Sequence, residues 1–316
     1  MPKYIETFKK GLLRTKIQAL MKMEENCCIC PRRCAVNRLK NKTGYCKTGL
    51  FAKAYNYTAH MGEEPVISGK NGSGAIFFSN CNMSCCYCQN YKFSQLNEGK
   101  EINKDTLSDM MLELQNKGCH NINLVTPTHV SAQALDALEL AITKGLNIPL
   151  VYNSSGYELP EVIQILNGVV DIYLVDMRYA DNKTAGKYSQ APNYPEYNQN
   201  SLLEMFKQAP IAKIKNNIMT EGIIIRHLIL PEGASGTEKI AEFINKRLSK
   251  QIHISLMSQY FPFYNAKKNP EINRRITQKE YDQAKAVLEK YYLTNGWVQE
   301  ESGLIDLAGV NLKKNV

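Results

Sequence analysis

Three cysteines in one short segment are the residues of this chain best suited to carry chemistry. Cys81, Cys85 and Cys88 have the spacing C-x3-C-x2-C, which lets a single loop hold three irons. An iron–sulfur cube has four irons and normally takes four thiolates. The triplet therefore predicts a cube with one iron left open, and an open metal position is where a reaction can take place. Cys86 stands between two of the predicted ligands, so a second spacing stays open.

A structural zinc loop and cysteines that only pack are the two alternatives for this triplet. Zinc sites more often pair two C-x2-C knuckles, whereas this segment supplies only three ligands in one place. We therefore favour the open cluster.

The residues around the triplet resemble a known signature. The pattern Cys81-x-x-x-Cys85-x-Tyr87-Cys88-x-Asn90 is similar to the radical S-adenosylmethionine (SAM) signature in its glycyl-radical-activating branch, and the chain resembles the uncharacterised group of pyruvate formate-lyase activating enzyme-like proteins. The resemblance covers roughly residues 27–262. It includes five further stretches: Cys27 to Cys34, Gly62-Glu63-Glu64-Pro65, Val125-Thr126-Pro127-Thr128-His129, Tyr152-Asn153-Ser154-Ser155-Gly156-Tyr157 and Arg226-His227-Leu228.

This resemblance implies an oxidoreductase that uses a [4Fe–4S] cluster and SAM. An electron from the cluster breaks a carbon–sulfur bond of SAM, and the resulting 5′-deoxyadenosyl radical abstracts a hydrogen atom. The implied partners are an electron donor such as flavodoxin or ferredoxin, and a glycyl radical enzyme that is activated. Two alternatives stay open: a radical enzyme acting on a small molecule, peptide or RNA, and a non-catalytic iron–sulfur or zinc protein.

The resemblance also implies which polar side chains hold SAM, while no residue is assigned as a catalytic acid or base. The implied SAM-binding residues follow or lie within predicted strands: Thr126, Thr128, His129, Asn153, Ser154, Asp176, Arg178, Arg226 and His227. Most relatives carry a Gly-Gly-Glu-like motif where this chain has residues 126–129. The alternatives are a helix entry at Thr128, a surface ion pair of Asp176 with Arg178, and a core histidine at His227.

A second group of cysteines precedes the triplet. Its spacing is C-x2-C-x3-C-x11-C, and four thiolates at such distances would close a tetrahedral site: Cys27, Cys30, Cys34 and Cys46. A zinc ion and a fully ligated auxiliary iron–sulfur cluster both fit this pattern. The adjacent carboxylates of Glu63 and Glu64 either serve a substrate or face water.

Short apolar runs alternate with helical patterns from about residue 75 onward. The runs at 75–78, 121–125, 149–152, 171–175, 223–230 and 252–256 predict six strands, separated by segments with helical spacing. Strands separated by helices pair in parallel through right-handed crossovers. Six units are too few for a closed barrel of eight. We therefore expect an α/β fold, the partial (β/α)6 TIM-like barrel that the resemblance also implies, with its site at the carboxyl ends of the strands.

Four segments are predicted along the chain. Residues 1–26 form an amphipathic helix, 27–70 a cysteine-rich metal-binding segment, 71–262 the partial barrel, and 263–316 a C-terminal accessory extension. The extension contains a helix that opens with a capping box, Thr277-x-x-Glu280.

The composition limits the environment and the partners. The chain has 316 residues with 44% hydrophobic content, and no apolar stretch is long enough to span a membrane. The net charge of +9 comes from lysines spread along the chain, without the basic blocks that indicate nucleic-acid binding. Ten cysteines without an export signal favour a reducing compartment, the cytoplasm, in which clustered thiols bind metals.

Overall fold

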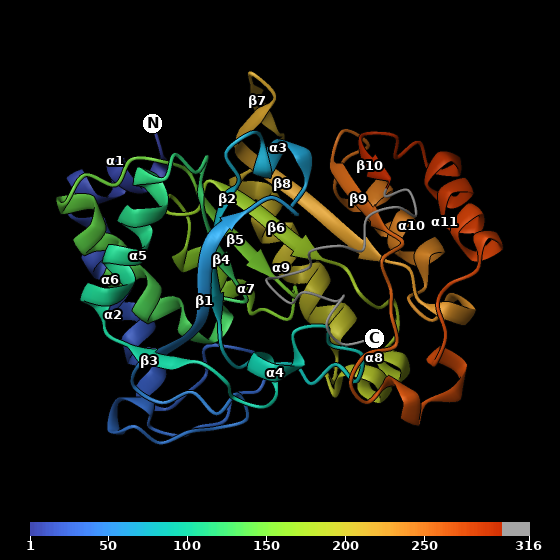
Figure 1. The fold of residues 1–316 in the computed structure, drawn as a ribbon, viewed down its shortest axis with the longest axis horizontal. Helices are drawn as coiled ribbons and strands as arrows, with labels where there is room; N and C mark the ends of the chain where they lie inside the picture. The colour runs from blue at the N-terminus through green and yellow to red at the C-terminus, as the bar shows by residue number, and fades with distance from the viewer. Residues whose placement is uncertain (299–316) are drawn as a thin grey trace.

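The chain folds around one open, mostly parallel sheet, described here from a computed structural model for residues 1–298 (Figure 1). The strand order is β10-β9-β8-β6-β5-β4-β2-β1-β3. Six parallel strands form its centre: β2 (Ser73–Phe78), β4 (Ile122–Val125), β5 (Leu150–Ser154), β6 (Ile172–Asp176), β8 (Ile218–Leu228) and β9 (His253–Met257). The predicted fold class is confirmed, and each of these strands matches one predicted apolar run.

Four further strands were not predicted. They are β1 (Ala52–His60), β3 (Lys100–Ile102), β7 (Lys213–Lys215) and β10 (Gly296–Val298). Strand β1 pairs antiparallel with β2, so the predicted boundary at residue 70 separates two strands that pair with each other. Much of β1 is only half buried, as is common for antiparallel strands, and it therefore lacks an apolar run.

The C-terminal region also contributes to the sheet, because β10 pairs in parallel with β9. Residues 299–316 of the predicted C-terminal extension lie outside the described residues. The capping box at Thr277 and Glu280 is present at the start of the last helix.

The longer helices flank the sheet (Figure 1). Their bounds are α1 (Lys3–Lys9), α2 (Leu12–Glu25), α5 (Lys104–Asn116), α6 (Ser131–Thr143), α7 (Pro160–Ile165), α8 (Asn182–Ser189), α9 (Tyr194–Gln208), α10 (Thr237–Arg247) and α11 (Gln278–Lys290). The amphipathic N-terminal segment is two helices, and α2 packs on α6 with Leu13, Ile17 and Leu20 buried. None of the helices in the described part of the chain has the length and apolar character needed to cross a membrane.

Shorter helical turns connect these elements. They are α3 (Pro65–Ser68), α4 (Tyr91–Ser94) and five 3-10 turns: η1 (Arg38–Lys40), η2 (Thr128–Val130), η3 (Pro231–Gly233), η4 (Ala266–Lys268) and η5 (Pro270–Ile272).

Helix α3 fills part of the inner face of the sheet. Its Val66 and Ile67 pack in one buried cluster with inward-facing side chains of three strands, Val151, Leu174 and Ile224. Successive side chains of a strand point to opposite faces, so the residues two positions further along share this inner face. Those residues are Asn153, Asp176 and Arg226. The inner face is thus apolar beside α3 and polar toward the carboxyl ends of the strands.

Candidate active site

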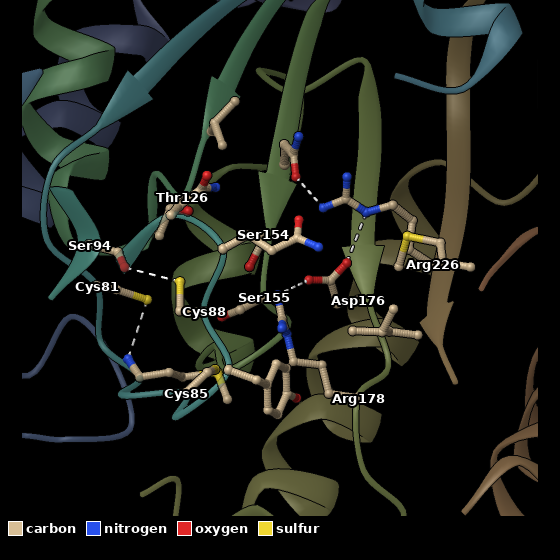
Figure 2. Close-up of a pocket in the computed structure, with 18 of the residues that line it drawn as sticks. Cys81, Cys85, Cys88, Ser94, Thr126, Ser154, Ser155, Asp176, Arg178 and Arg226 are labelled. Atoms are coloured by element: carbon tan, nitrogen blue, oxygen red, sulfur yellow. Dashed lines mark hydrogen bonds and ion pairs between the residues drawn. The ribbon is translucent and has the colours of Figure 1, made fainter. Parts of the chain in front are cut away.

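A cavity opens at the carboxyl ends of the parallel strands (Figure 2). The three cysteines of the C-x3-C-x2-C segment, called the cavity triplet below, line it together with six of the nine predicted SAM-binding residues: Thr126, Asn153, Ser154, Asp176, Arg178 and Arg226. Segments far apart in the sequence therefore converge where the strand pattern predicted.

The loop that carries the cavity triplet follows β2 and is held by backbone hydrogen bonds. Ser84 N–H donates to Ser189 O at 3.0 Å, and Cys86 N–H donates to Tyr188 O at 2.7 Å. The side chain of Asn82 donates to Tyr157 O at 2.7 Å. The loop is thus fixed from α8 and from the segment after β5, which orients its three sulfurs before any ligand binds.

Each sulfur of the triplet has a polar neighbour. Met83 N–H donates to Cys81 Sγ at 3.4 Å, Ser189 Oγ lies 3.0 Å from Cys85 Sγ, and Ser94 Oγ lies 3.1 Å from Cys88 Sγ. Hydrogen bonds to sulfur tune iron–sulfur clusters, and thiolates are the ligands that such clusters require.

The fourth cysteine of this segment does not face the cavity. Cys86 is absent from the cavity lining, and its sulfur accepts a hydrogen bond from the Asn269 side chain at 3.6 Å. In the described structure, therefore, only the C-x3-C-x2-C members of the segment face the cavity.

The protonation of these thiols depends on burial. Burial raises the pKa of Cys81 to about 12 and that of Cys88 to about 11. Such thiols stay neutral in the protein alone and lose their protons when a metal binds. Arg178 opposes the shift at both sulfurs, since its positive charge favours the thiolate.

Alternating charges form a chain across the cavity wall. Asp176 accepts hydrogen bonds from Arg178 Nη2 at 2.5 Å and from Arg226 Nε at 2.8 Å. Arg226 also lies 3.4 Å from Glu63 Oε2, and its Nη2 donates to Asn153 Oδ1 at 2.6 Å. Burial disfavours ionisation of Asp176, but the two guanidinium groups outweigh burial and lower its pKa. Asp176 is therefore a buried carboxylate held in its charged form.

Glu63 joins this site from the segment before α3. It lines the cavity and accepts hydrogen bonds from Asn123 Nδ2 at 3.1 Å and from Asn153 Nδ2 at 3.3 Å. Burial raises its pKa, although Arg226 opposes the shift. Its neighbour Glu64 is also buried but does not line the cavity. The sequence left open whether Glu63 serves a substrate or faces water. In the structure, Glu63 lines the cavity.

Three predicted SAM-binding residues lie outside the cavity: Thr128, His129 and His227. Thr128 Oγ1 donates to Glu158 Oε1 at 2.5 Å, and His129 Nε2 lies 2.8 Å from Ser79 O. Thr126 has a left-handed backbone with φ of 60°, after which η2 turns the following side chains into the core. Burial lowers the pKa of His129 to about 4, so its ring is neutral.

His227 has the geometry of a core histidine. Its Nδ1 lies 2.8 Å from Met177 O and its Nε2 lies 2.9 Å from Thr237 Oγ1, so both ring nitrogens have partners within the protein. Adjacent strand residues face opposite ways, and Arg226 occupies the inner face. The ring of His227 therefore lies outside the cavity, on the opposite face from Arg226.

Several lining residues were not predicted as site residues. They include His60, Ser155, Gln259, Tyr260 and Phe261. Gln259 to Phe261 follow β9, so the rule that sites form at strand ends could have found them. Ser155 adjoins two predicted residues, whereas His60 ends a strand that the sequence did not reveal.

The lining carries buried polar atoms that have no partner within the described protein: Ser155 Oγ, Asn90 Oδ1 and Arg178 Nε. Buried polar groups nearly always find hydrogen bonds, so these atoms are suited to a polar ligand. Together with three thiols at one edge, the donor set fits an iron–sulfur cluster and a zwitterionic cofactor.

Comparison with known proteins places the chain in a family. The model of the Radical SAM superfamily matches residues 75–244. An uncharacterized protein of Methanocaldococcus jannaschii is 34% identical over 301 residues, which cover 92% of this chain and 82% of that protein. The chain therefore belongs to the radical SAM superfamily. Membership implies a [4Fe–4S] cluster and SAM as cofactors, and chemistry that starts by cleaving SAM.

Two solved structures are similar to the fold. A domain of pyruvate-formate lyase-activating enzyme from Bacteroides vulgatus is 14% identical, with a TM-score of 0.39, covering 53% of this chain and 89% of that one. HydG, a maturase of the [FeFe]-hydrogenase, is 14% identical with a TM-score of 0.47, covering 70% of this chain and 50% of that one.

Proposed function

We propose that the cavity triplet holds the [4Fe–4S] cluster through three irons and leaves the fourth iron to SAM. The observation that carries the proposal is the position of the three thiols, which share one cavity with the polar ends of the parallel strands. When bound, the cluster supplies the electron that cleaves SAM to methionine and a 5′-deoxyadenosyl radical. The protein's own part is to hold and shield the reactants.

Different groups of the cavity wall bind different parts of SAM: a cation binds its carboxylate, and neutral polar groups bind its amine and ribose. The guanidinium of Arg178 borders the triplet and has a free Nε, so it is suited to the methionine carboxylate. The hydroxyl of Ser155 and the amide oxygen of Asn90 have no partner within the described protein and are suited to the amine and the ribose. Ser154 lines the cavity, but its hydroxyl donates to Glu158 and accepts from Gly156 N–H at 3.0 Å, so Ser154 shapes the wall. Thr128, His129 and His227 are left out of this contact set because they lie outside the cavity.

The Asp176–Arg226–Glu63 arm lies deeper along the inner face of the sheet. Asp176 holds both arginines in place, since each donates to one of its carboxylate oxygens. Truncating one member of such a buried network leaves an uncompensated charge. We therefore assign Asp176 as a positioning residue for Arg178, and Thr126 and Asn153 as the polar contacts beside it.

A product assay tests the radical chemistry. Anaerobically reconstituted, reduced protein is mixed with SAM, and 5′-deoxyadenosine is quantified by chromatography. We expect product from the wild type and from Cys119→Ala, a matched control whose buried thiol lies outside the cavity. The variant with Cys81, Cys85 and Cys88 changed to Ala should form none. Product from that variant, or none from a wild type carrying its cluster, contradicts the proposal and favours a non-catalytic iron–sulfur protein.

We further propose that the hydrogen atom comes from a glycine of a partner enzyme. The support is the signature around Cys81 to Asn90, which resembles the glycyl-radical-activating branch. Flavodoxin or ferredoxin is the expected electron donor, and ten unpaired cysteines suit a reducing compartment such as the cytoplasm.

The target is tested with deuterated partners. The protein is incubated with SAM and a candidate glycyl radical enzyme carrying deuterated glycine. Deuterium in 5′-deoxyadenosine is the expected result. In the electron paramagnetic resonance (EPR) spectrum, the unlabelled partner should give a glycyl doublet, which collapses to a narrow signal when the remaining α-hydrogen is deuterium. Deuterium transfer from a small molecule, peptide or RNA instead would assign the alternative substrate class.

A further inference from the structure

Four cysteines of the N-terminal segment lie outside the cavity, beside the loop of the cavity triplet. They are called the N-terminal tetrad: Cys27, Cys30, Cys34 and Cys46. We propose that the tetrad binds a second iron–sulfur cube, closed by four thiolates, and that its segment braces the triplet loop. The bracing role rests on the proposed function, whereas the second cube does not.

The backbone brings the tetrad together. Cys27 N–H donates to Val36 O at 2.9 Å and Ala35 N–H donates to Cys27 O at 3.0 Å, so residues 27–36 fold back on themselves. Tyr45 N–H donates to Cys34 Sγ at 3.3 Å, which brings Cys46 to the same place. A Cβ at Gly44 would lie 2.8 Å from Cys34 Sγ, so only glycine allows this approach.

The tetrad and the triplet share a pattern of hydrogen bonds to sulfur. In the tetrad, the backbone N–H of Tyr45 donates to Cys34 Sγ at 3.3 Å. In the triplet, the backbone N–H of Met83 donates to Cys81 Sγ at 3.4 Å. Such donors stabilise thiolates that ligate iron. The tetrad is therefore built like the site that the family loads with a cluster.

A buried cation accompanies the tetrad. Arg38 is fully buried, pairs with the equally buried Glu24 at 3.0 Å and donates to Gly49 O at 3.2 Å, and its positive charge favours the thiolate of Cys27. Buried charges normally require partners. A cube with four thiolates carries net negative charge, so the guanidinium beside Cys27 is placed to offset it.

The tetrad segment touches the triplet loop at two points. Arg32, between Cys30 and Cys34, donates from Nε to Asn82 O at 2.8 Å, and its guanidinium lies 3.6 Å from the centre of the Tyr45 ring. Tyr45 Oη donates to Ser84 Oγ at 2.7 Å. Both acceptors lie between Cys81 and Cys85. These two contacts connect the tetrad segment to the loop that carries the triplet, so a cluster bound at the tetrad also orders the triplet loop.

Metal analysis of full-length, anaerobically reconstituted protein tests the second cube. Each cube holds four irons, so we expect about eight irons per chain in the wild type and about four after the triplet is changed to Ala. The Cys30→Ser/Cys34→Ser variant should also hold about four, and the control Cys28→Ser about eight. In the triplet variant, SAM should leave the EPR spectrum of the reduced cluster unchanged.

One zinc per chain in the triplet variant, or no iron there, overturns the second cube. This variant leaves the N-terminal segment intact, so it decides the matter even if the Cys30→Ser/Cys34→Ser protein does not fold. A wild type with eight irons that forms no 5′-deoxyadenosine would refute the proposed function and leave the second cube standing.

Discussion

The two cysteine-rich regions are built from the same local parts and differ in what lies opposite their sulfurs. Around the tetrad, the chain itself closes the site through Gly44 and Tyr45, and a buried ion pair occupies the remaining space. Opposite the triplet lies a cavity whose wall carries unpartnered polar atoms. A loop of thiols is therefore a candidate reaction site only where a cavity with free polar groups lies opposite its sulfurs.

The cations beside the two regions are also arranged differently. Arg38 has one acid partner, Glu24, and both side chains are sealed from water. Arg178 shares Asp176 with Arg226 and keeps Nε free at the cavity. A sealed pair supports structure, while a cation with a spare donor can bind a ligand.

Removing one thiolate from each region should give the largest contrast. Cys88 and Cys34 are both half buried, so Cys88→Ala and Cys34→Ala remove similar packing. We expect Cys88→Ala to reduce 5′-deoxyadenosine formation to background at nearly unchanged stability. Cys34→Ala should keep SAM cleavage and lower the thermal unfolding temperature, because a four-thiolate centre then lacks a ligand. If both variants lose SAM cleavage equally, the two cysteine regions do not have separate roles.

The buried pair beside the tetrad gives the next largest effect. Arg38→Met leaves Glu24 buried without a cation, with only the amide of Gln133 as a partner, which should cost about 3–5 kcal/mol of unfolding free energy. Urea denaturation under anaerobic conditions measures this loss. As a control, Arg33→Met breaks a solvent-exposed pair with Glu161 and should cost less than about 1 kcal/mol. If both variants lost the same unfolding free energy, the Arg38–Glu24 pair would not be shielded from water.

Local patterns in the sequence predicted the features that depend on neighbouring residues. The triplet is defined by spacing within one loop, and four of the six parallel strands, β2, β4, β5 and β6, are buried on both faces and therefore appear as apolar runs. The strand-end rule then brought Asn153, Asp176 and Arg226 to the same cavity, although they lie on three strands.

Features that depend on distant contacts could not be predicted. Glu63 is held at the cavity by contacts with Asn123, Asn153 and Arg226, which lie far along the chain. Helix α3, which follows it, packs on strands that are equally distant in sequence. Alternation along a strand implied that Arg226 and His227 face opposite ways, but not which of them faces inward. In the structure, Arg226 faces inward and bonds to Asp176 and Asn153, while the ring of His227 bonds to Thr237 on the outer side.

The buried acid behind the cavity wall predicts a pH dependence. Glu158 has hydroxyl partners, Thr128, Tyr152 and Ser154, and burial raises its pKa from 4.5 to about 7. Between these values the folded protein holds a proton that the unfolded chain releases, so this group's contribution to stability falls as pH rises from about 4.5 to 7.

Glu158→Gln mimics the protonated acid and should remove this pH dependence. Relative to the wild type, we expect the variant to gain on the order of 2–3 kcal/mol between pH 4.5 and 7 in urea denaturation. Asp176→Asn serves as the contrast, since the arginines lower the pKa of Asp176, and its neutralisation takes the carboxylate away from Arg178 and leaves Arg226 with Glu63 alone. Parallel pH profiles for wild type and Glu158→Gln would contradict the assignment.

The smallest effect tests the link between the two regions. Tyr45→Phe removes the hydroxyl that bonds to Ser84 Oγ and Gln190 Oε1 while keeping the ring under Arg32, and one such bond contributes about 1 kcal/mol. If opening of the triplet loop limits iron loss, a chelator should remove its cluster about fivefold faster in the variant. Tyr292→Phe, which removes an exposed hydroxyl, should leave the rate unchanged. Equal rates in Tyr45→Phe and the wild type would mean that the tetrad segment lies against the loop without bracing it, since a bracing contact must slow the opening that exposes Cys81 and Cys85.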